Sequence, residues 1–234
     1  GDSARRIGPF YHDMPHPERS LQWWAFNTSK RGITLDMESP PGRETFQRLA
    51  ASAHFVIESF PPGYLDSLGL GYSTLSQLNP GLILISITPF GQTGPYKDLK
   101  ASDIVLMAMG GQMFSAGYPD RPPVRPSIAQ AYLLAGAHGA TAGMVALNYR
   151  LRTGWGQHVD ISTQACVTRL LSAEISLWEF NRELYPREGY FRPAGGGLKV
   201  RLVWPCQDGA VTIRPGIGGF LRGIRPLVNW MASE

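Results

Sequence analysis

Cysteine and charged residues are scarce in this sequence. Its 234 residues include two cysteines, Cys166 and Cys206. They lie too far apart in the sequence for a metal motif, and they are too few for a disulfide framework. Charged residues make up 17 % of the chain, against about 25 % in an average protein. The polar start lacks a secretory signal, and no segment has the roughly 20 aliphatic residues of a membrane span. We therefore expect a cytoplasmic protein with no membrane contact.

Several catalytic and nucleotide-binding motifs are absent as well. Gly69-Leu70-Gly71 is only part of a dinucleotide fingerprint, and the chain has neither a Walker loop nor a Gly-x-Ser-x-Gly elbow. His12 and His16 lie four residues apart, but the prolines around them prevent a helix, so we expect no metal site. Lys/Arg runs never exceed two residues, so we expect no nucleic-acid partner. The net charge of +4 fits an ordinary surface or an anionic ligand.

Glycine and proline are abundant instead, with 27 and 19 residues, and 43 % of the chain is apolar. These numbers indicate a packed core with many turns. The residue pattern predicts strands at 32–36, 54–58, 82–87 and 158–162. It predicts helices at 42–52, 64–68, 74–78 with Ser73 as N-cap, 103–109 with Ser102 as N-cap, 130–152 and 165–180.

The segment at 82–87 is apolar without alternation, which is typical of a parallel strand covered on both faces. Strands and helices alternate around it, which predicts an α/β fold with an open, Rossmann-like parallel sheet. The loop at 88–95 follows the carboxyl end of this strand, where ligands of such sheets bind. We expect the sheet domain at 1–165, a helical linker at 166–190 and the start of a smaller α+β domain at 191–234, with short strands at 198–203 and 210–213.

Several segments, taken in their order along the chain, resemble those of one known family. They are Gly1-Asp2-Ser3-Ala4-Arg5, the run from Phe26 to Asp36, Glu58-Ser59-Phe60-Pro61-Pro62-Gly63, Leu68-Gly69-Leu70-Gly71-Tyr72, Phe90-Gly91-Gln92-Thr93-Gly94-Pro95 and the run from Arg152 to Asp160. Together they resemble the family III CoA-transferases of the CaiB/BaiF type. The resemblance implies that the chain begins after the first βαβ unit of the large domain and stops inside the small domain.

The resemblance also implies a reaction. Enzymes of this family move coenzyme A between two carboxylic acids, and an aspartate attacks the acyl-CoA thioester to form a mixed anhydride. The expected ligands are a CoA thioester and a carboxylic acid, with no tightly bound cofactor. The implied assembly is an interlocked dimer, formed with a second copy or with a paralogue.

The position of the family's nucleophile falls on Tyr132, and no Asp or Glu occurs between Asp120 and Asp160. Two hypotheses follow. The chain is a transferase whose carboxylate comes from a partner chain or a missing segment, or it is a non-catalytic subunit that binds CoA or only supports a paralogue. A racemase of the same family is disfavoured, because its histidine position falls on Ser102.

The family's CoA contacts correspond to five positions, Leu35, Met37, Phe60, Leu68 and Lys100. For Leu35 and Phe60, ordinary packing in the core explains the residue type as well as a CoA contact does. For Lys100, a solvated lysine on the surface is an equally good explanation. Glu38 replaces a basic residue of the family and opposes a phosphate there. We expect Asp103 to cap its own helix and to orient Lys100, and Gly195–Gly197 to form either a mobile loop or a linker.

Overall fold

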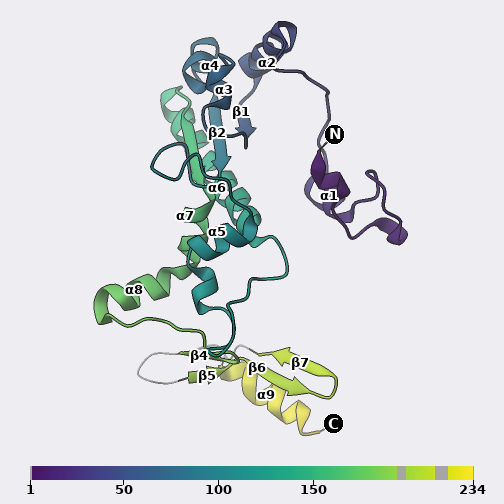
Figure 1. Ribbon diagram of the computed structural model, residues 1–234, viewed down its shortest axis with the longest axis vertical. Coiled ribbons are helices and arrows are strands. Elements are labelled where there is room, and N and C mark those ends of the chain that lie inside the picture. The colour runs from purple at the N-terminus through teal and green to yellow at the C-terminus, as the bar shows by residue number, and fades with distance from the viewer. Residues whose placement is uncertain (1, 194–198, 214–220, 234) are drawn as a thin grey trace. The chain divides into compact units, whose positions relative to one another are not determined.

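The computed structural model describes residues 2–193, 199–213 and 221–233, which form two compact units, residues 1–46 and 47–234. Figure 1 traces the chain from the N-terminal helices to helix α9. The predicted glycine loop at Gly195–Gly197 lies outside the described residues. The division at 165 and 190 that the sequence suggested stays a prediction.

The first unit contains three short helical segments, the 3-10 helices η1 (Ser3–Arg6) and η2 (Tyr11–Asp13) and helix α1 (Leu21–Phe26). Ser20 is fully buried and is the N-cap of α1. Its hydroxyl accepts a hydrogen bond from the Trp23 N–H at 3.1 Å and donates one to the Ile7 carbonyl at 2.6 Å. One buried serine therefore joins the helix to the preceding segment.

The strand predicted at 32–36 is wrong, because the structure has no strand there. A strand needs a neighbour that pairs with its backbone N–H and C=O groups. Among residues 2–46 the backbone bridge that the structure records joins Phe10 to Ser20 instead. The segment therefore stays extended without pairing, and helix α2 (Pro40–Ser52) follows it, two residues earlier than expected.

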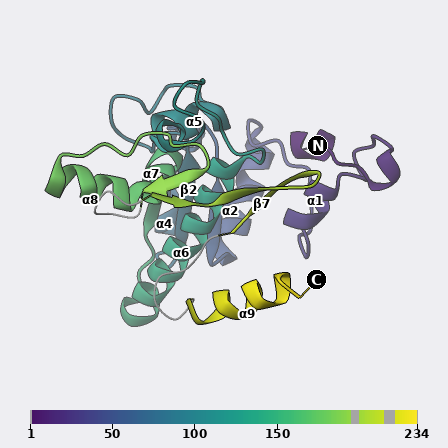
Figure 2. The ribbon, with the colours of Figure 1, turned by 90° about the horizontal axis from the view of Figure 1, so that it is seen from below.

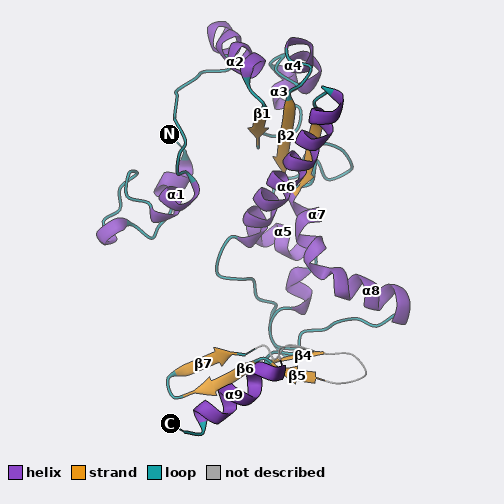
Figure 3. Ribbon diagram, turned by 180° about the vertical axis from the view of Figure 1, so that it is seen from behind, coloured by secondary structure: helices purple, strands orange, loops and turns teal. Residues whose placement is uncertain are grey.

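The second unit is built on a parallel sheet of three strands in the order β1 (Phe55–Glu58), β2 (Ile83–Thr88) and β3 (His158–Ser162). Figure 3 shows the three strands among the helices. The central strand is buried at five of its six positions, as its unbroken apolar sequence predicts. The predicted α/β fold with a parallel sheet is confirmed.

Up to residue 181, the helices that follow β1 lie between the strands of the parallel sheet or directly after β3. They are α3 (Tyr64–Ser67), α4 (Tyr72–Leu78), α5 (Asp103–Met109), α6 (Gln130–Thr153), α7 (Thr163–Thr168) and α8 (Ser172–Asn181), with the 3-10 helices η3 (Gln112–Ser115) and η4 (Arg169–Leu171). Helix α6 packs against β2 and β3. Figure 2 shows the course of α6 from below. The small residues of α6 allow this packing, because a Cβ on Gly143 would lie only 2.9 Å from Ile85 Cδ1.

Two further helices differ from the predictions. Helix α4 begins at Tyr72 with Gly71 as its N-cap, so Ser73 lies inside the first turn. The helix expected at 165–180 is broken by η4 into α7 and α8. Next to the break, the Thr168 hydroxyl donates to the Gln164 carbonyl at 3.0 Å, a local bond of the kind that often bends helices.

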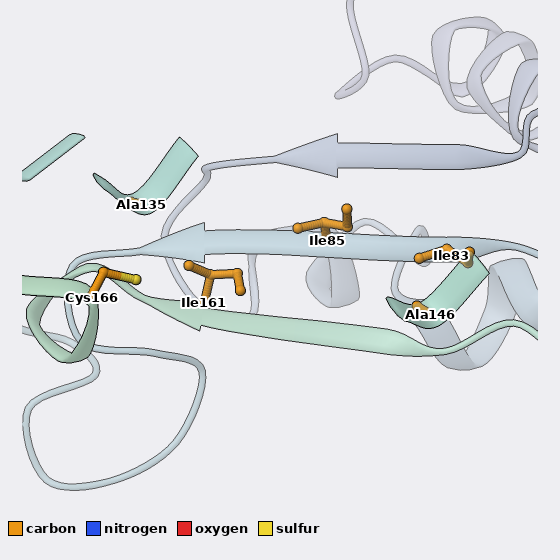
Figure 4. Close-up of a cluster of buried hydrophobic side chains, with 6 residues drawn as sticks. All are labelled: Ile83, Ile85, Ala135, Ala146, Ile161 and Cys166. Atoms are coloured by element: carbon orange, nitrogen blue, oxygen red, sulfur yellow. The ribbon is translucent and has the colours of Figure 1, made fainter. Parts of the chain in front are cut away.

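The sheet core contains apolar residues from both layers, as Figure 4 shows. Ile83 and Ile85 project from β2, and Ile161 from β3. Ala135 and Ala146 of α6 pack on them. Their small side chains bring the helix close to the sheet.

The C-terminal part of the chain has two antiparallel pairs. Strand β4 (Phe191–Pro193) pairs with β5 (Lys199–Arg201), and β6 (Val203–Cys206) pairs with β7 (Gly209–Thr212). Helix α9 (Leu221–Met231) follows. The strand predicted at 198–203 is thus two strands, and the one at 210–213 corresponds to β7.

In the described ranges, no helix is both long and apolar enough to cross a bilayer. The cytoplasmic location stays a prediction.

Candidate functional site

A cavity of about 610 Å³ lies at the carboxyl ends of β1 and β2. Its wall contains the strand ends, the segments after them, and the facing parts of α5 and α6. The lining residues are Ile57, Glu58, Ser59, Phe60, Ile87, Thr88, Pro89, Ala101, Leu106, Tyr132, Ala135, Gly136 and Thr163. The carboxyl end of a central strand is where the sequence placed a ligand.

Most of the cavity wall is apolar, and its charge is negative. Among the described lining residues, the formal negative charge comes from the carboxylate of Glu58. Its carboxylate oxygen Oε2 accepts a hydrogen bond from the Phe60 N–H at 2.7 Å. The bond turns the chain after β1, and the Phe60 ring then lies 4.9 Å from the Tyr64 ring, centroid to centroid. Glu58 thus fixes the direction in which Phe60 leaves the strand.

Tyr132 reaches the same cavity from the first turn of α6. Its side chain is 52 % exposed, so a ligand can contact the phenol. The turn that carries it is held by Asp103, whose Oδ1 accepts a hydrogen bond from the Ala131 N–H at 2.9 Å. The other oxygen pairs with Arg125 Nη1 at 3.3 Å. The preceding Ser102 is the N-cap of α5 but makes no capping hydrogen bond through its side chain.

These contacts correct one expectation. Asp103 was expected to cap its own helix and to orient Lys100. Its recorded partners are instead Ala131 and Arg125, so it caps α6 from outside. A buried carboxylate is stabilised more by a backbone N–H and a guanidinium than by a flexible surface lysine.

Two threonines form the polar part of the wall near the end of β2. The Thr163 hydroxyl donates to the Thr88 carbonyl at 2.9 Å, and Thr163 is 3 % exposed. Thr88 itself is 1 % exposed, and its own hydroxyl has no hydrogen-bond partner among the described residues. A buried unpaired hydroxyl costs about 1–3 kcal/mol. Thr88 is therefore a residue of the cavity wall whose hydroxyl has no hydrogen-bond partner among the described residues.

The loop after β2 is tied to the neighbouring strand. The Gln92 N–H donates to Asp160 Oδ2 at 2.9 Å, and the Gln164 N–H donates to the Pro89 carbonyl at 3.0 Å. Asp160 belongs to β3, and Gln164 to α7. The loop is thereby anchored at both of these points, which fixes the cavity wall at Pro89.

The structure brings together two residues of the predicted site, Phe60 and Tyr132, on one cavity wall. Leu68 ends α3, and Lys100 is exposed on the loop next to the lining residue Ala101. Leu35 and Met37 are half-buried in the first unit. Their role in CoA binding stays a prediction. The loop at 88–95, where a ligand was predicted, begins at Thr88, whereas no sequence pattern pointed to Thr163, which only the fold places at the cavity.

Comparison with known proteins identifies the family. Residues 1–229 match the family described as CoA-transferase family III. The chain therefore belongs to CoA-transferase family III, which confirms the resemblance noted in its sequence.

Three similar proteins illustrate the match. The chain is 36 % identical over 234 residues to subunit BbsE of succinyl-CoA:(R)-benzylsuccinate CoA-transferase from Thauera aromatica, covering 100 % of this chain and 56 % of the relative. It is 34 % identical over 191 residues to the beta subunit of succinyl-CoA–L-malate CoA-transferase from Chloroflexus aurantiacus, covering 81 % and 46 %. A crystal structure of a CaiB/BaiF family protein from Brucella suis superposes with a TM-score of 0.80 and 34 % identity, covering 98 % and 60 %. The chain thus spans about half the length of the curated relatives it matches.

Proposed function

We propose that this chain takes part in the transfer of coenzyme A between carboxylic acids, with an acyl-CoA as one substrate. The observation that carries the proposal is the family match over residues 1–229. The cavity supports it, since it lies at the carboxyl ends of parallel strands and is lined by Phe60, one of the expected CoA contacts. The proposed CoA-binding residues are Leu35, Met37, Phe60, Leu68 and Lys100.

The proposed nucleophile is not in this chain. Tyr132 occupies the position of the family's aspartate by sequence, and its phenol offers no carboxylate to form a mixed anhydride. We propose that an aspartate-bearing partner chain supplies the carboxylate. The matched relatives from T. aromatica and C. aurantiacus are both named as subunits, which favours a partner of the same family. A dimer of two identical chains is the alternative assembly.

A second candidate function is a non-catalytic subunit that binds CoA or only supports the catalytic paralogue. The prediction that the nucleophile position falls on Tyr132, which rests on the resemblance, favours it. The two candidates differ in one respect. In the first, the cavity of this chain holds the acyl-CoA during turnover, and in the second it does not.

The test compares the chain alone with the chain co-expressed with an aspartate-bearing paralogue. Each preparation is incubated with an acyl-CoA, treated with hydroxylamine or borohydride, and analysed by mass spectrometry. We expect transferase activity only in the mixed complex, with the trapped adduct on the paralogue. An adduct on this chain alone would contradict the proposed partner. Full activity of a complex in which Phe60→Ala has abolished CoA binding to this chain, but not to the paralogue, would favour the supporting role.

A further inference from the structure

A second cavity lies between η3, the end of η4, α8 and the segment that follows α8. Its volume is about 80 Å³, which leaves room for more than one water-sized group. It shares no lining residue with the cavity at the strand ends. Arg182 ends α8 in the left-handed conformation. Residues 183–185 then line the same cavity as Glu174 and Trp178 of the helix.

Aromatic rings from three segments line this second cavity, Phe114 of η3, Trp178 of α8 and Tyr185 after the helix. The face of an aromatic ring is negative and attracts cations. Two of these rings already do so within the chain. The Arg182 guanidinium lies 5.5 Å from the centroid of the Trp178 ring, and that of Arg192 lies 5.5 Å from the Tyr185 centroid. Neither arginine lines the cavity, so the space between the rings is left without a cation of this chain in the described ranges.

The charged residues that line the second cavity are both acidic, Glu174 and Glu183. Glu174 Oε1 lies 3.7 Å from Arg192 Nη2. The Glu183 side chain is exposed, and no ion pair is recorded for it in the part of the chain that the structure describes. An anion in this cavity would meet two like charges, and an uncharged group would gain only apolar contact. A cation gains both a carboxylate and the ring faces.

We propose that the second cavity binds an organic cation, an alkylammonium or guanidinium group, with Glu183 as its counter-ion. Phe114, Trp178 and Tyr185 form its aromatic wall. The same chemistry is offered by a free amine and by a lysine or arginine side chain of a partner chain. Neither source involves CoA, so the inference goes beyond the proposed function and is independent of it.

The experiment labels the whole chain with 5-fluorotryptophan and follows it by fluorine NMR. The chain has six tryptophans, and the Trp178 signal is the one that disappears in Trp178→Phe. The remaining signals are internal controls. The probes propylammonium, 1-propanol and propionate have the same number of carbon atoms and differ in the charge of the head group. A further probe, Nα-acetyl-lysine methylamide, presents the ammonium group as a side chain.

We expect propylammonium to shift the Trp178 signal with a midpoint of about 10 mM, and 1-propanol and propionate to leave it in place. Glu183→Gln should weaken binding about three- to fivefold. Glu179→Gln is the matched control, because Glu179 is exposed on α8 and lies outside the cavity, and it should bind like the wild type. The inference is overturned by no shift with propylammonium, by an equal shift with 1-propanol, or by unchanged affinity of Glu183→Gln.

The lysine probe separates the two sources of the cation. Binding as tight as that of propylammonium supports a side chain of a partner chain, and binding of propylammonium alone supports a free amine. A transferase assay of Glu183→Gln with the aspartate-bearing paralogue is run in parallel. Absence of activity in wild type and variant alike would count against the proposed function, whereas the NMR titration decides the cation site by itself.

Discussion

The carboxylate of Asp103 accepts a hydrogen bond from the backbone N–H of Ala131, 2.9 Å away, and so caps a helix to which it does not belong. Asp103 is the first residue of α5, and Ala131 lies in the first turn of α6. The first N–H groups of a helix have no partner within it, and α6 has no capping side chain of its own. The tertiary contact therefore supplies what the local sequence lacks, directly before Tyr132.

Replacing Asp103 by Ala should destabilise the protein by about 1–3 kcal/mol, because the Ala131 N–H loses a charged acceptor. Asp103→Asn keeps one acceptor oxygen and should lose less. Urea unfolding followed by circular dichroism measures the difference. Asp98→Ala, at an exposed position of the preceding loop, is the control. Equal stability of Asp103→Ala and Asp98→Ala would show that the contact contributes nothing.

A matched pair of glycines in α6 tests how tightly the helix packs on the sheet. A Cβ on Gly143 would lie 2.9 Å from Ile85 Cδ1, whereas a Cβ on Gly136 would meet nothing within 4 Å. Gly136→Ala should stabilise the helix by up to about 1 kcal/mol. Gly143→Ala should cost about 1–3 kcal/mol through overpacking, which the helix preference offsets only in part. Thermal melts of both variants measure this, and identical shifts would refute the close packing.

The lone buried thiol gives a pH-dependent prediction. Cys166 is 7 % exposed, and burial raises the pKa of its thiol above the ordinary value of 9.0. The unfolded chain therefore loses this proton at a lower pH than the folded protein. The neutral thiol makes its full contribution to the free energy of unfolding below about pH 9. This contribution is lost as the pH rises through the folded-state pKa.

We expect Cys166→Ala to lose less stability than the wild type between about pH 8.5 and 10.5, a range that spans the usual thiol pKa. Urea unfolding at a series of pH values measures the difference. In a second measurement, iodoacetamide should modify the exposed Cys206 first and Cys166 only after denaturation. Modification of Cys166 in the native protein at the rate of Cys206 would contradict its burial.

Lys100 is the predicted cationic contact for a CoA phosphate. It is exposed beside the cavity residue Ala101, so its contribution should be modest and should depend on salt. Lys100→Ala should weaken CoA binding about three- to fivefold at low salt, measured by calorimetry. Lys97→Ala, on the same loop, should bind like the wild type. If the two variants behave alike, Lys100 has no specific role in the site.

Tyr132 can be converted to the family's nucleophile. Tyr132→Asp would place a carboxylate at the cavity, on the turn that Asp103 holds. We expect the carboxylate of this variant to attack an acyl-CoA thioester, forming an acyl anhydride as the CoA thiolate leaves. Hydroxylamine then converts the activated aspartate into a hydroxamate, a covalent adduct that mass spectrometry detects. Tyr132→Asn has the same shape without the charge and should form none. An adduct of equal yield on the wild type would disprove the assigned position.

Local patterns predicted the sheet well and the connections less well. The apolar run of β2 indicated a buried parallel strand, and the turn residues around it located the cavity at its end. The strand predicted at 32–36 failed because pairing depends on a neighbour that the segment itself does not specify. The helix at 165–180 was broken by η4, a local change that apolar spacing does not record.

The site was predictable only where a motif carried it. Phe60 and Tyr132 were placed by resemblance, and both line the cavity. The contact between Asp103 and Ala131, and the unpaired hydroxyl of Thr88, depend on which segments the fold brings together. No pattern within one segment encodes the contact between Asp103 and Ala131, because the two residues lie 28 positions apart in the sequence.

The register of the sheet also sets an order of assembly during synthesis. Strand β2 pairs with β1 soon after both have been made, but its other edge pairs with β3, where Leu84 meets His158. A ribosome adds about 5–20 residues per second, so several seconds pass before β3 emerges. During this time the most apolar strand of the chain has one uncovered edge. Slower growth or added chaperones during expression should therefore protect this edge until β3 has been made.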